Sequence, residues 1–214
     1  MITARCLRNI GLAFFIMLIL LSGCRNTTPP VRFYSLTPLP AGSGEIKDAG
    51  STGPLSVGIG PVEILKSLDR PHIVTRTGPN RLKVDDFHRW AGSLYDDFLR
   101  VMTMNLVELL QTNRVAAYPW EDYFSPDYRI FMEVRRFDGN LGEYVVLDLT
   151  WTITGREARE ALLVRRSLLK APVGGMKYEA LVAAKSALLA DLSREIAREI
   201  KILNDSKEKG NPRN

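Results

Sequence analysis

The sequence predicts an α+β domain in which a mainly antiparallel sheet is covered by two helices. Residues 87–110 and 178–203 lack proline and repeat apolar side chains at helical spacing. Residues 128–137 and 143–154 alternate apolar with polar side chains and flank an Asp-Gly-Asn turn sequence that is typical of a hairpin. Long hairpins combined with helices favour a sheet with helices on one face over a doubly wound fold.

Shorter strands complete the predicted order β-β-β-α-β-β-β-β-α. Apolar alternation and flanking turn signals place them at residues 55–60, 73–76, 81–84, 115–118 and 160–171. A Thr-Gly-Pro-Asn turn joins the second and third of these into a hairpin. Pro61 indicates that the first strand ends at a sheet edge or at a bend.

Both predicted helices carry an apolar stripe that should face the sheet. In the first helix, Trp90 shares helical spacing with Leu94 and Phe98, which favours a core position over an interface anchor. The stripe of the last helix consists of Leu181, Leu188, Leu192, Ile196 and Ile200. Glu195 and Glu199 stand three or four residues from basic side chains, the pattern of a solvated helix face.

Composition divides the chain into four segments. Residues 1–23 predict a signal peptide, residues 55–204 a single domain and residues 205–214 a frayed polar tail. Residues 24–54 hold five prolines and predict a flexible tether that carries lipid. Within that tether, residues 33–36 are apolar enough to dock as a short edge strand.

The N-terminus has the layout of a bacterial lipoprotein signal. Arg5 and Arg8 precede an apolar run over residues 11–21 that is too short to span a membrane. The run ends in a sequence that looks like a lipobox, Leu21-Ser22-Gly23-Cys24. The resemblance implies a diacylglycerol thioether on Cys24, cleavage before it, and acylation of the new N-terminus, for example by palmitate. The alternatives are a plain signal with a chance cysteine and an uncleaved anchor helix.

Charge and cysteine usage exclude several function classes. Part of the net charge of +5 belongs to the signal, and no basic face indicates nucleic acid as a partner. Cys6 leaves with the signal and lipid occupies Cys24, so no disulfide, redox pair or zinc site is expected. We expect no cofactor beyond the covalent lipid.

Catalytic motifs are missing from the sequence. It contains no P-loop, HExxH or GxSxG pattern, and we therefore predict neither catalytic nor metal-binding residues. His88 lies near Asp85 and Asp86, a set that could orient an imidazole or bind a metal. Acids just ahead of a predicted helix more often cap its N-terminus, and we favour that interpretation.

A restricted turn precedes the first hairpin. Asp69 and Arg70 stand before Pro71 and His72, and proline restricts both its own φ and its predecessor. The pair could form a local salt bridge within the turn, or the loop could be a rigid recognition loop for a partner.

Several of these stretches together resemble one family. They lie behind a lipobox and occur in a fixed order: Tyr34-Ser35-Leu36, Val57-Gly58-Ile59-Gly60-Pro61-Val62, Leu68-Asp69-Arg70-Pro71-His72-Ile73-Val74-Thr75-Arg76, Asn80-Arg81-Leu82 and His88-Arg89-Trp90-Ala91. They are similar to the PqiC/YmbA family of ABC-transport auxiliary lipoproteins. The densest part of the match runs over residues 57–110, and His72 stands where the family pattern suggests glutamine.

The resemblance implies a non-enzymatic periplasmic partner of an MCE (mammalian cell entry) lipid-transport system. Such a subunit would dock an MCE-domain protein as a ring-like homo-oligomer and help to maintain envelope integrity. Its partner-binding loop would comprise Asp69, Arg70, Pro71 and His72. The alternatives are another envelope-binding lipoprotein, acting on lipopolysaccharide or peptidoglycan, and an envelope hydrolase.

Membrane sorting follows from the residue after the lipobox. Arg25 stands where, by resemblance to other bacterial lipoproteins, an aspartate would retain the protein in the inner membrane. The sequence therefore predicts an outer-membrane lipoprotein that faces the periplasm of a Gram-negative bacterium.

Overall fold

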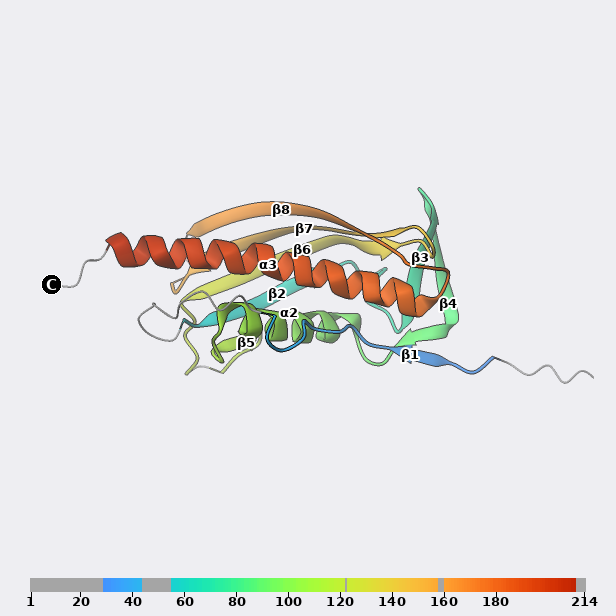
Figure 1. Cartoon of the computed structure of the whole chain (residues 1–214), viewed down its shortest axis with the longest axis horizontal. Helices are drawn as coiled ribbons and strands as arrows, with labels where there is room; N and C mark the ends of the chain where they lie inside the picture. Colours follow the sequence, from blue (N-terminus) through green and yellow to red (C-terminus); the bar gives the residue numbers. More distant parts are fainter. Residues whose placement is uncertain (1–28, 44–54, 122, 158–159, 211–214) are drawn as a thin grey trace, which may run out of the picture. The chain divides into compact units, whose positions relative to one another are not determined.

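The computed structural model describes residues 29–43, 55–121, 123–157 and 160–210 (Figure 1). The chain divides into two units, Met1–Pro30 and Val31–Asn214, and the described elements all belong to the second. In order they are β1 (Arg32–Tyr34), β2 (Val57–Ile64), β3 (His72–Gly78), β4 (Arg81–Trp90), α2 (Leu94–Leu110), β5 (Val115–Ala117), β6 (Tyr128–Gly139), β7 (Tyr144–Gly155), β8 (Ala161–Pro172) and α3 (Tyr178–Gly210). The predicted signal peptide, the lipobox and Cys24 lie outside the described residues.

The strands of the described part of the chain form a small sheet and a large one. The small sheet has the order β1-β4-β3 and the large one the order β5-β2-β6-β7-β8. The long ladders β3–β4, β6–β7 and β7–β8 are antiparallel, whereas β1–β4, β2–β5 and β2–β6 are parallel. Both α2 and α3 pack along the large sheet (Figure 1). The predicted α+β class is confirmed, as is the predicted order of elements from residue 55 onward.

The main core lies between the large sheet and the two helices. One face of β7 is buried along its length, with Val145, Leu147, Leu149, Trp151 and Ile153 fully enclosed. The predicted stripe of α3 from Leu181 to Ile200 is equally enclosed. The alternation of period two and the helical period therefore both identified the buried faces correctly.

The first helix begins later than the sequence predicts. Residues 87–90 belong to β4, because β1 pairs in parallel along them. The helix starts at Leu94, where the side chain of Ser93 accepts a hydrogen bond from Asp96 N at 3.0 Å. The acids of the first turn are Asp96 and Asp97. The expectation that Asp85 and Asp86 cap this helix is therefore wrong.

Two strand boundaries depend on packing that the sequence does not display. Strand β6 continues through Asp138 and Gly139, and the chain turns after them, over residues 140–143. A side chain at Gly139 would collide with the backbone of Tyr144, so this strand end needs glycine for close approach. At Pro61, β2 bends through an irregularity between Ile59 and Val62 while remaining an interior strand.

The N-terminal segment is part of the domain from β1 onward. The predicted edge strand forms as β1, and Leu36 behind it is buried. The backbone N–H of Thr37 then donates to Ser186 Oγ at 3.0 Å, and that of Leu39 donates to Asn105 Oδ1 at 2.7 Å. A domain start at residue 55 was therefore too late, because residues 32–43 find hydrogen-bond partners on the helices.

The last helix differs from expectation at its end and on one face. It extends to Gly210, so residues 205–210 are helical although polar. Glu195 accepts a hydrogen bond from Ser167 Oγ, and Glu199 pairs with Arg165 at 2.8 Å, so both acids face β8. The solvated-face interpretation was wrong because spacing along a helix does not reveal what packs beside it.

Candidate functional site at the junction of the two sheets

The proline-restricted loop is fixed at both ends. Leu68 is buried, and Asp69 Oδ1 accepts a hydrogen bond from the backbone N–H of Tyr95 at the start of α2, at 3.3 Å. The carbonyl of Pro71 accepts from Trp90 N at 2.8 Å. Among the described residues no ion pair joins Asp69 to Arg70, whose side chain is exposed. The local salt bridge is thus absent from this part of the chain, and the loop presents a free cation.

A buried ion cluster lies where β3 of the small sheet meets β6 of the large one. Asp138 accepts hydrogen bonds from Arg76 Nε and Nη2 at 3.0 and 2.8 Å, and from Arg136 Nε at 2.9 Å. Burial alone would raise the pKa of Asp138, but these hydrogen bonds hold it below its usual range. The bidentate bridge ties β3 to β6 across the two sheets.

A fully buried lysine completes the cluster. Lys185 Nζ donates to the carbonyl of Phe137 at 2.8 Å and lies 5.2 Å from the ring centroid of Trp90. Burial lowers the pKa of Lys185 to about 8, against the opposing effect of Asp138. Trp90 is only 4% exposed, so its predicted core position is confirmed. Arg76 and Trp90, which both stand in the stretches that carry the family resemblance, therefore contact this cluster, Arg76 through Asp138 and Trp90 through Lys185.

The sequence contained a signal for the buried lysine. Lys185 stands four residues after Leu181 and three before Leu188, which is the spacing of the buried stripe of α3. A lysine at such a position indicates either a buried partner or an ion pair. The sequence contains no comparable signal for Asp138. The pairing of β6 with β7 is irregular between Val134 and Arg136, so the alternation of buried and exposed side chains changes phase before Asp138 is reached.

An aromatic stack forms the other half of the junction. The rings of Tyr34, His88 and Tyr178 contact one another in a triangle. The centroid separations are 5.8 Å from Tyr34 to His88, 3.9 Å from His88 to Tyr178 and 6.4 Å from Tyr34 to Tyr178. His88 Nδ1 is 2.7 Å from Asp85 Oδ1, and the Tyr178 hydroxyl donates to Asp85 Oδ2 at 3.1 Å. Burial opposes ionisation of Asp85, yet the hydrogen bonds from His88, Phe87 N–H and Tyr178 lower its pKa to about 2. The cluster joins β1, β4 and the start of α3.

The chemistry of this stack is that of a clamp between elements. A His–Asp pair can orient a general base, and covalent catalysis would in addition need a nucleophile within hydrogen-bond reach of the imidazole. Among the hydrogen bonds of the described residues, His88 is joined to Asp85 and to no serine, threonine or cysteine. Burial raises the pKa of Tyr178 to about 12, so its hydroxyl stays a donor to Asp85. Nor do the described residues contain a group of three potential metal ligands.

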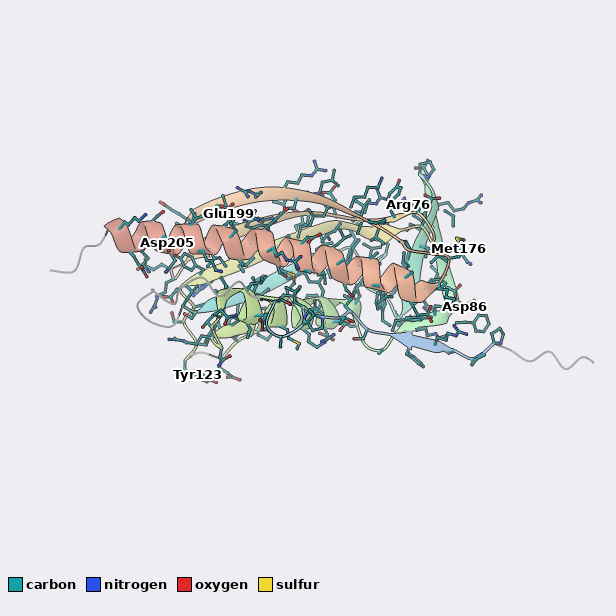
Figure 2. The ribbon with its side chains drawn as sticks, in the orientation of Figure 1. Arg76, Asp86, Tyr123, Met176, Glu199 and Asp205 are labelled. Carbon is teal, nitrogen blue, oxygen red and sulfur yellow. The ribbon has the colours of Figure 1, made fainter. Side chains whose placement is uncertain are left out.

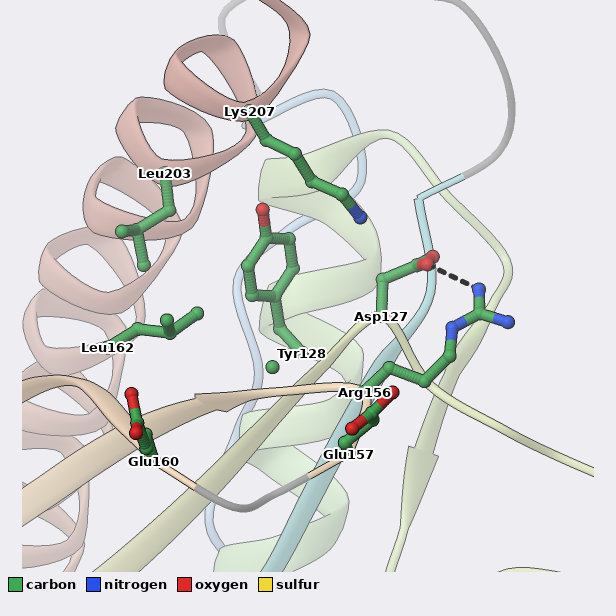
Figure 3. Close-up of a pocket in the computed structure, with 9 residues that line it drawn as sticks. Asp127, Tyr128, Arg156, Glu157, Glu160, Leu162, Leu203 and Lys207 are labelled. Carbon is green, nitrogen blue, oxygen red and sulfur yellow. Dashed lines mark hydrogen bonds and ion pairs between the residues drawn. The ribbon is translucent and has the colours of Figure 1, made fainter. Parts of the chain in front are cut away.

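The far end of the domain holds a cavity of about 550 Å³ that the sequence did not predict. It lies between the end of α3 and the β7–β8 turn, with Leu162, Leu203 and the Tyr128 ring on one side (Figure 3). On the other side are Lys207 and an ion pair of 2.6 Å between Arg156 and Asp127. Its lining carries acids as well as bases, so charge alone selects no ligand class.

The fold places the chain in a class of known α+β domains. A crystal structure of an uncharacterized protein matches with a TM-score of 0.63 and 18% identity over 80% of this chain and 99% of that one. Protein XCC0632 from Xanthomonas campestris, of the DUF330 family, matches with a TM-score of 0.63 and 17% identity over 84% and 99%. A PelC dodecamer from Paraburkholderia phytofirmans matches at a TM-score of 0.39 and 13% identity, over 67% and 93%. No curated protein matches.

The family follows from the sequence match over the same region. The model of the ABC-type transport auxiliary lipoprotein component matches residues 34–197, from the last residue of β1 into α3. The chain belongs to this family, and the predicted PqiC/YmbA resemblance is confirmed. No helix in the described part of the chain is both long and apolar enough to cross a membrane.

Proposed function

We propose that this chain is anchored through acylated Cys24 to the periplasmic side of the outer membrane and serves an MCE-type ABC system as a non-enzymatic auxiliary subunit. The system would move phospholipid and maintain the envelope. The observation that carries the proposal is the family match, because it spans the junction and the loop at residues 68–72. The lipobox at Leu21-Ser22-Gly23-Cys24 and the absence of aspartate at position 25 support the anchoring and the sorting.

The loop at residues 68–72 is the proposed contact with the MCE-domain protein. Its backbone is held by Leu68 and Asp69, so Arg70 is presented from a fixed base. A preorganised arginine loses little conformational freedom on binding, and arginine is enriched among residues that dominate binding energy. An exposed arginine contributes little to folding. Binding and stability are therefore separable at this position.

Association with further copies is the second part of the proposal. Strand β8 is an edge strand of the large sheet and presents Leu162, Val164 and Leu168 to solvent, with 49 to 65% of each residue exposed. Contiguous exposed apolar side chains mark interaction surfaces, and an unpaired edge favours pairing with another chain. Native mass spectrometry of the acylated protein should show a homo-oligomer, and a strictly monomeric protein would contradict this part.

Affinity capture from envelope membranes tests the partner. Wild-type protein should retain an MCE-domain protein and its ABC ATPase, whereas Arg70→Ala should lose most of both at an unchanged melting temperature. Arg198→Ala, an exposed arginine on α3, is the matched control and should retain them. Retention of lipopolysaccharide or peptidoglycan factors in place of the MCE protein would favour the alternative envelope-binding lipoprotein.

Fractionation tests the anchor and the sorting. Cys24→Ala should yield a folded domain that no longer sediments with membranes, because the acyl chains supply the membrane affinity. Wild-type protein should fractionate with outer-membrane markers. Membrane retention of Cys24→Ala after signal cleavage would refute the lipid anchor, and wild-type protein in the inner membrane would refute the sorting.

A further inference from the structure

The segment between β5 and β6 builds an aromatic cluster outside the main core. The rings of Tyr118 and Trp120 meet edge to face with their centroids 5.5 Å apart, and those of Trp120 and Phe124 are 6.3 Å apart. None of the three side chains belongs to the hydrophobic core that the described residues form. Packing between the sheet and the helices therefore does not account for them.

Two glycines of β2 make room for this cluster. A side chain at Gly58 would collide with the Trp120 ring, because its Cβ would lie 2.8 Å from the ring carbons. Gly60 has a φ of +114°, which favours glycine, and a Cβ there would lie 2.8 Å from Tyr118 Cβ. Both glycines belong to residues 57–62, a stretch that carries part of the family resemblance. Strand β2 is thus shaped to seat the aromatic rings.

An arginine without a polar partner lies against the same cluster. Arg129 is the register partner of Gly58 on β6, and its guanidinium carbon lies over the Trp120 ring, 5.9 Å from the centroid. Among the described residues, the half-buried Arg129 side chain forms no hydrogen bond or ion pair, and its Nε is buried without an acceptor. The ring offsets part of the cost of desolvating the cation. The guanidinium keeps its capacity to bind a carboxylate or a phosphate.

The arginine and two of the rings line a small cavity, here called the aromatic pocket. Its volume is about 240 Å³, and its lining consists of Trp120, Glu121, Phe124, Ser125 and Arg129. Sites for drug-sized molecules have roughly 300–1,000 Å³, so this pocket suits a side chain or a headgroup without an acyl chain. Glu121 is exposed, so water screens its charge more than that of Arg129. The pocket therefore favours a small anionic group.

We propose that the aromatic pocket binds an aspartate or glutamate side chain in an extended segment of a protein partner. The carboxylate would pair with Arg129, and an apolar neighbour in the segment would pack on Trp120 and Phe124. Tryptophan, tyrosine and arginine are enriched among the residues that dominate protein–protein binding energy. The inference rests on the proposed function and deepens it, because it adds to Arg70 a second contact with the MCE-domain protein and states its chemistry.

The position of the pocket favours a protein over a lipid headgroup. Tyr123, in the segment that carries the pocket, lies at the opposite end of the domain from Asp86 and Met176 (Figure 2). Asp86 belongs to β4, which pairs with β1, and the proposed tether enters the fold through β1. A protein can thus reach the pocket while the domain stays anchored. A phospholipid bound there would leave its acyl chains in water.

Photo-crosslinking in the intact envelope tests the occupant. The photoreactive residue p-benzoylphenylalanine takes the place of Phe124 in the acylated full-length protein. The matched control carries it in place of Met176, which is 73% exposed at the opposite end. Position 124 should form an adduct with a partner protein that position 176 does not form. Mass spectrometry of the digested adduct should find aspartate or glutamate within two residues of the crosslink.

Charge removal tests the role of the arginine. Arg129→Gln should reduce the adduct at position 124 at least five-fold, whereas Arg198→Gln, on the exposed face of α3, should leave it unchanged. The melting temperature of Arg129→Gln should stay close to that of the wild type, because its side chain makes no hydrogen bond within the described part of the chain. If the photoreactive residue at position 124 unfolds the domain, Tyr118 is the second position for it.

The crosslinked segment, made as a synthetic peptide, tests recognition directly. Trp90 and Trp151 are buried, so a change of intrinsic fluorescence on titration reports on Trp120. Wild-type protein should bind the peptide about ten-fold more tightly than the same peptide with its acid replaced by the amide. Arg129→Gln should remove this difference between the two peptides.

Every outcome bears on the proposal. An adduct with a second copy of this chain, with lipid alone, or with no partner at either position would overturn it. Equal affinity for the acid and the amide peptide would do the same. If the adduct contains an acidic segment of a protein without an MCE domain, the pocket is supported and the proposed partner is refuted. If Arg70→Ala loses the MCE-domain protein but Arg129→Gln does not, the pocket alone is refuted.

Discussion

The two interior regions of this domain are filled in opposite ways. Between the large sheet and the helices the interior is mainly apolar, with Trp151 and Leu192 fully enclosed, and its buried polar side chains, such as Asn105, are uncharged. At the junction beneath the small sheet, the interior contains Asp138 and Lys185. Burial of apolar surface is non-directional and stabilises the fold in proportion to the area buried. A buried ion pair depends on the geometry of its two groups, and removing one of them leaves an uncompensated charge in the interior. The comparison indicates that burial stabilises the sandwich and that directional bonds position the small sheet on it.

Truncation in the apolar region should have the largest effect. Trp151→Ala should lower the free energy of unfolding by about 3–5 kcal/mol, because it leaves a cavity and removes the hydrogen bond from Trp151 Nε1 to Ser167. Urea unfolding followed by circular dichroism measures this loss. Ile202→Ala, at an exposed position of α3, is the control and should change little. A loss below that of the control would show that the sandwich does not depend on this packing.

Removing the buried anion should cost somewhat less. Asp138→Ala leaves Arg76 and Lys185 without their counter-charge, and breaking a buried pair typically costs about 3 kcal/mol or more. The double variant Asp138→Ala with Lys185→Met should recover part of the loss, as urea unfolding of the series would show. Strict additivity of the two substitutions would indicate that these groups do not interact.

Replacing the buried lysine should change the pH dependence more than the stability. Its pKa is lowered to about 8 in the folded protein, against 10.5 for lysine unfolded. Between these values the unfolded chain binds more protons, so wild-type stability should rise relative to Lys185→Met as pH increases from about 8 to about 10.5. Both proteins contain the same tyrosines, so the difference between their free energies of unfolding removes the contribution of tyrosine ionisation. If the difference in free energy of unfolding between the two proteins stays constant over this pH range, the pKa of Lys185 lies outside it.

The smallest effect is expected at the aromatic stack. Asp85→Asn should cost about 1–2 kcal/mol at neutral pH through weakened hydrogen bonds. The pKa of Asp85 is lowered to about 2 from 3.8, so its contribution is complete above pH 4 and is lost as pH falls through 2. The stability gap between wild type and Asp85→Asn should therefore close over that interval. If wild type were still more stable than Asp85→Asn by the same amount at pH 2, the lowered pKa of Asp85 could not be the source of the difference.

The sequence predicted the regions of regular period and missed those that depend on distant partners. The buried face of β7 followed from alternation, and the stripe of α3 from helical spacing. Residues 87–90 also suited a helix, but pairing with β1 makes them a strand, and that pairing is a contact between segments far apart in the chain. Strand β6 continues through Asp138 because Asp138 pairs with Val146 of β7. That Asp138 is buried as the partner of Arg76 is a contact between distant segments, which its place in a turn-like sequence does not reveal.

By itself, the sequence determined the fold class, the order of elements from residue 55, the buried faces and the family. These properties depend on local period and on short motifs, which a chain carries in its order of residues. Only the tertiary structure decided where β1 adds to the small sheet, that Lys185 and Asp138 share one interior, and that Glu195 and Glu199 face β8. Each of these is a long-range contact of a polar group, whose burial depends on finding a specific partner, and sequence spacing does not record that partner.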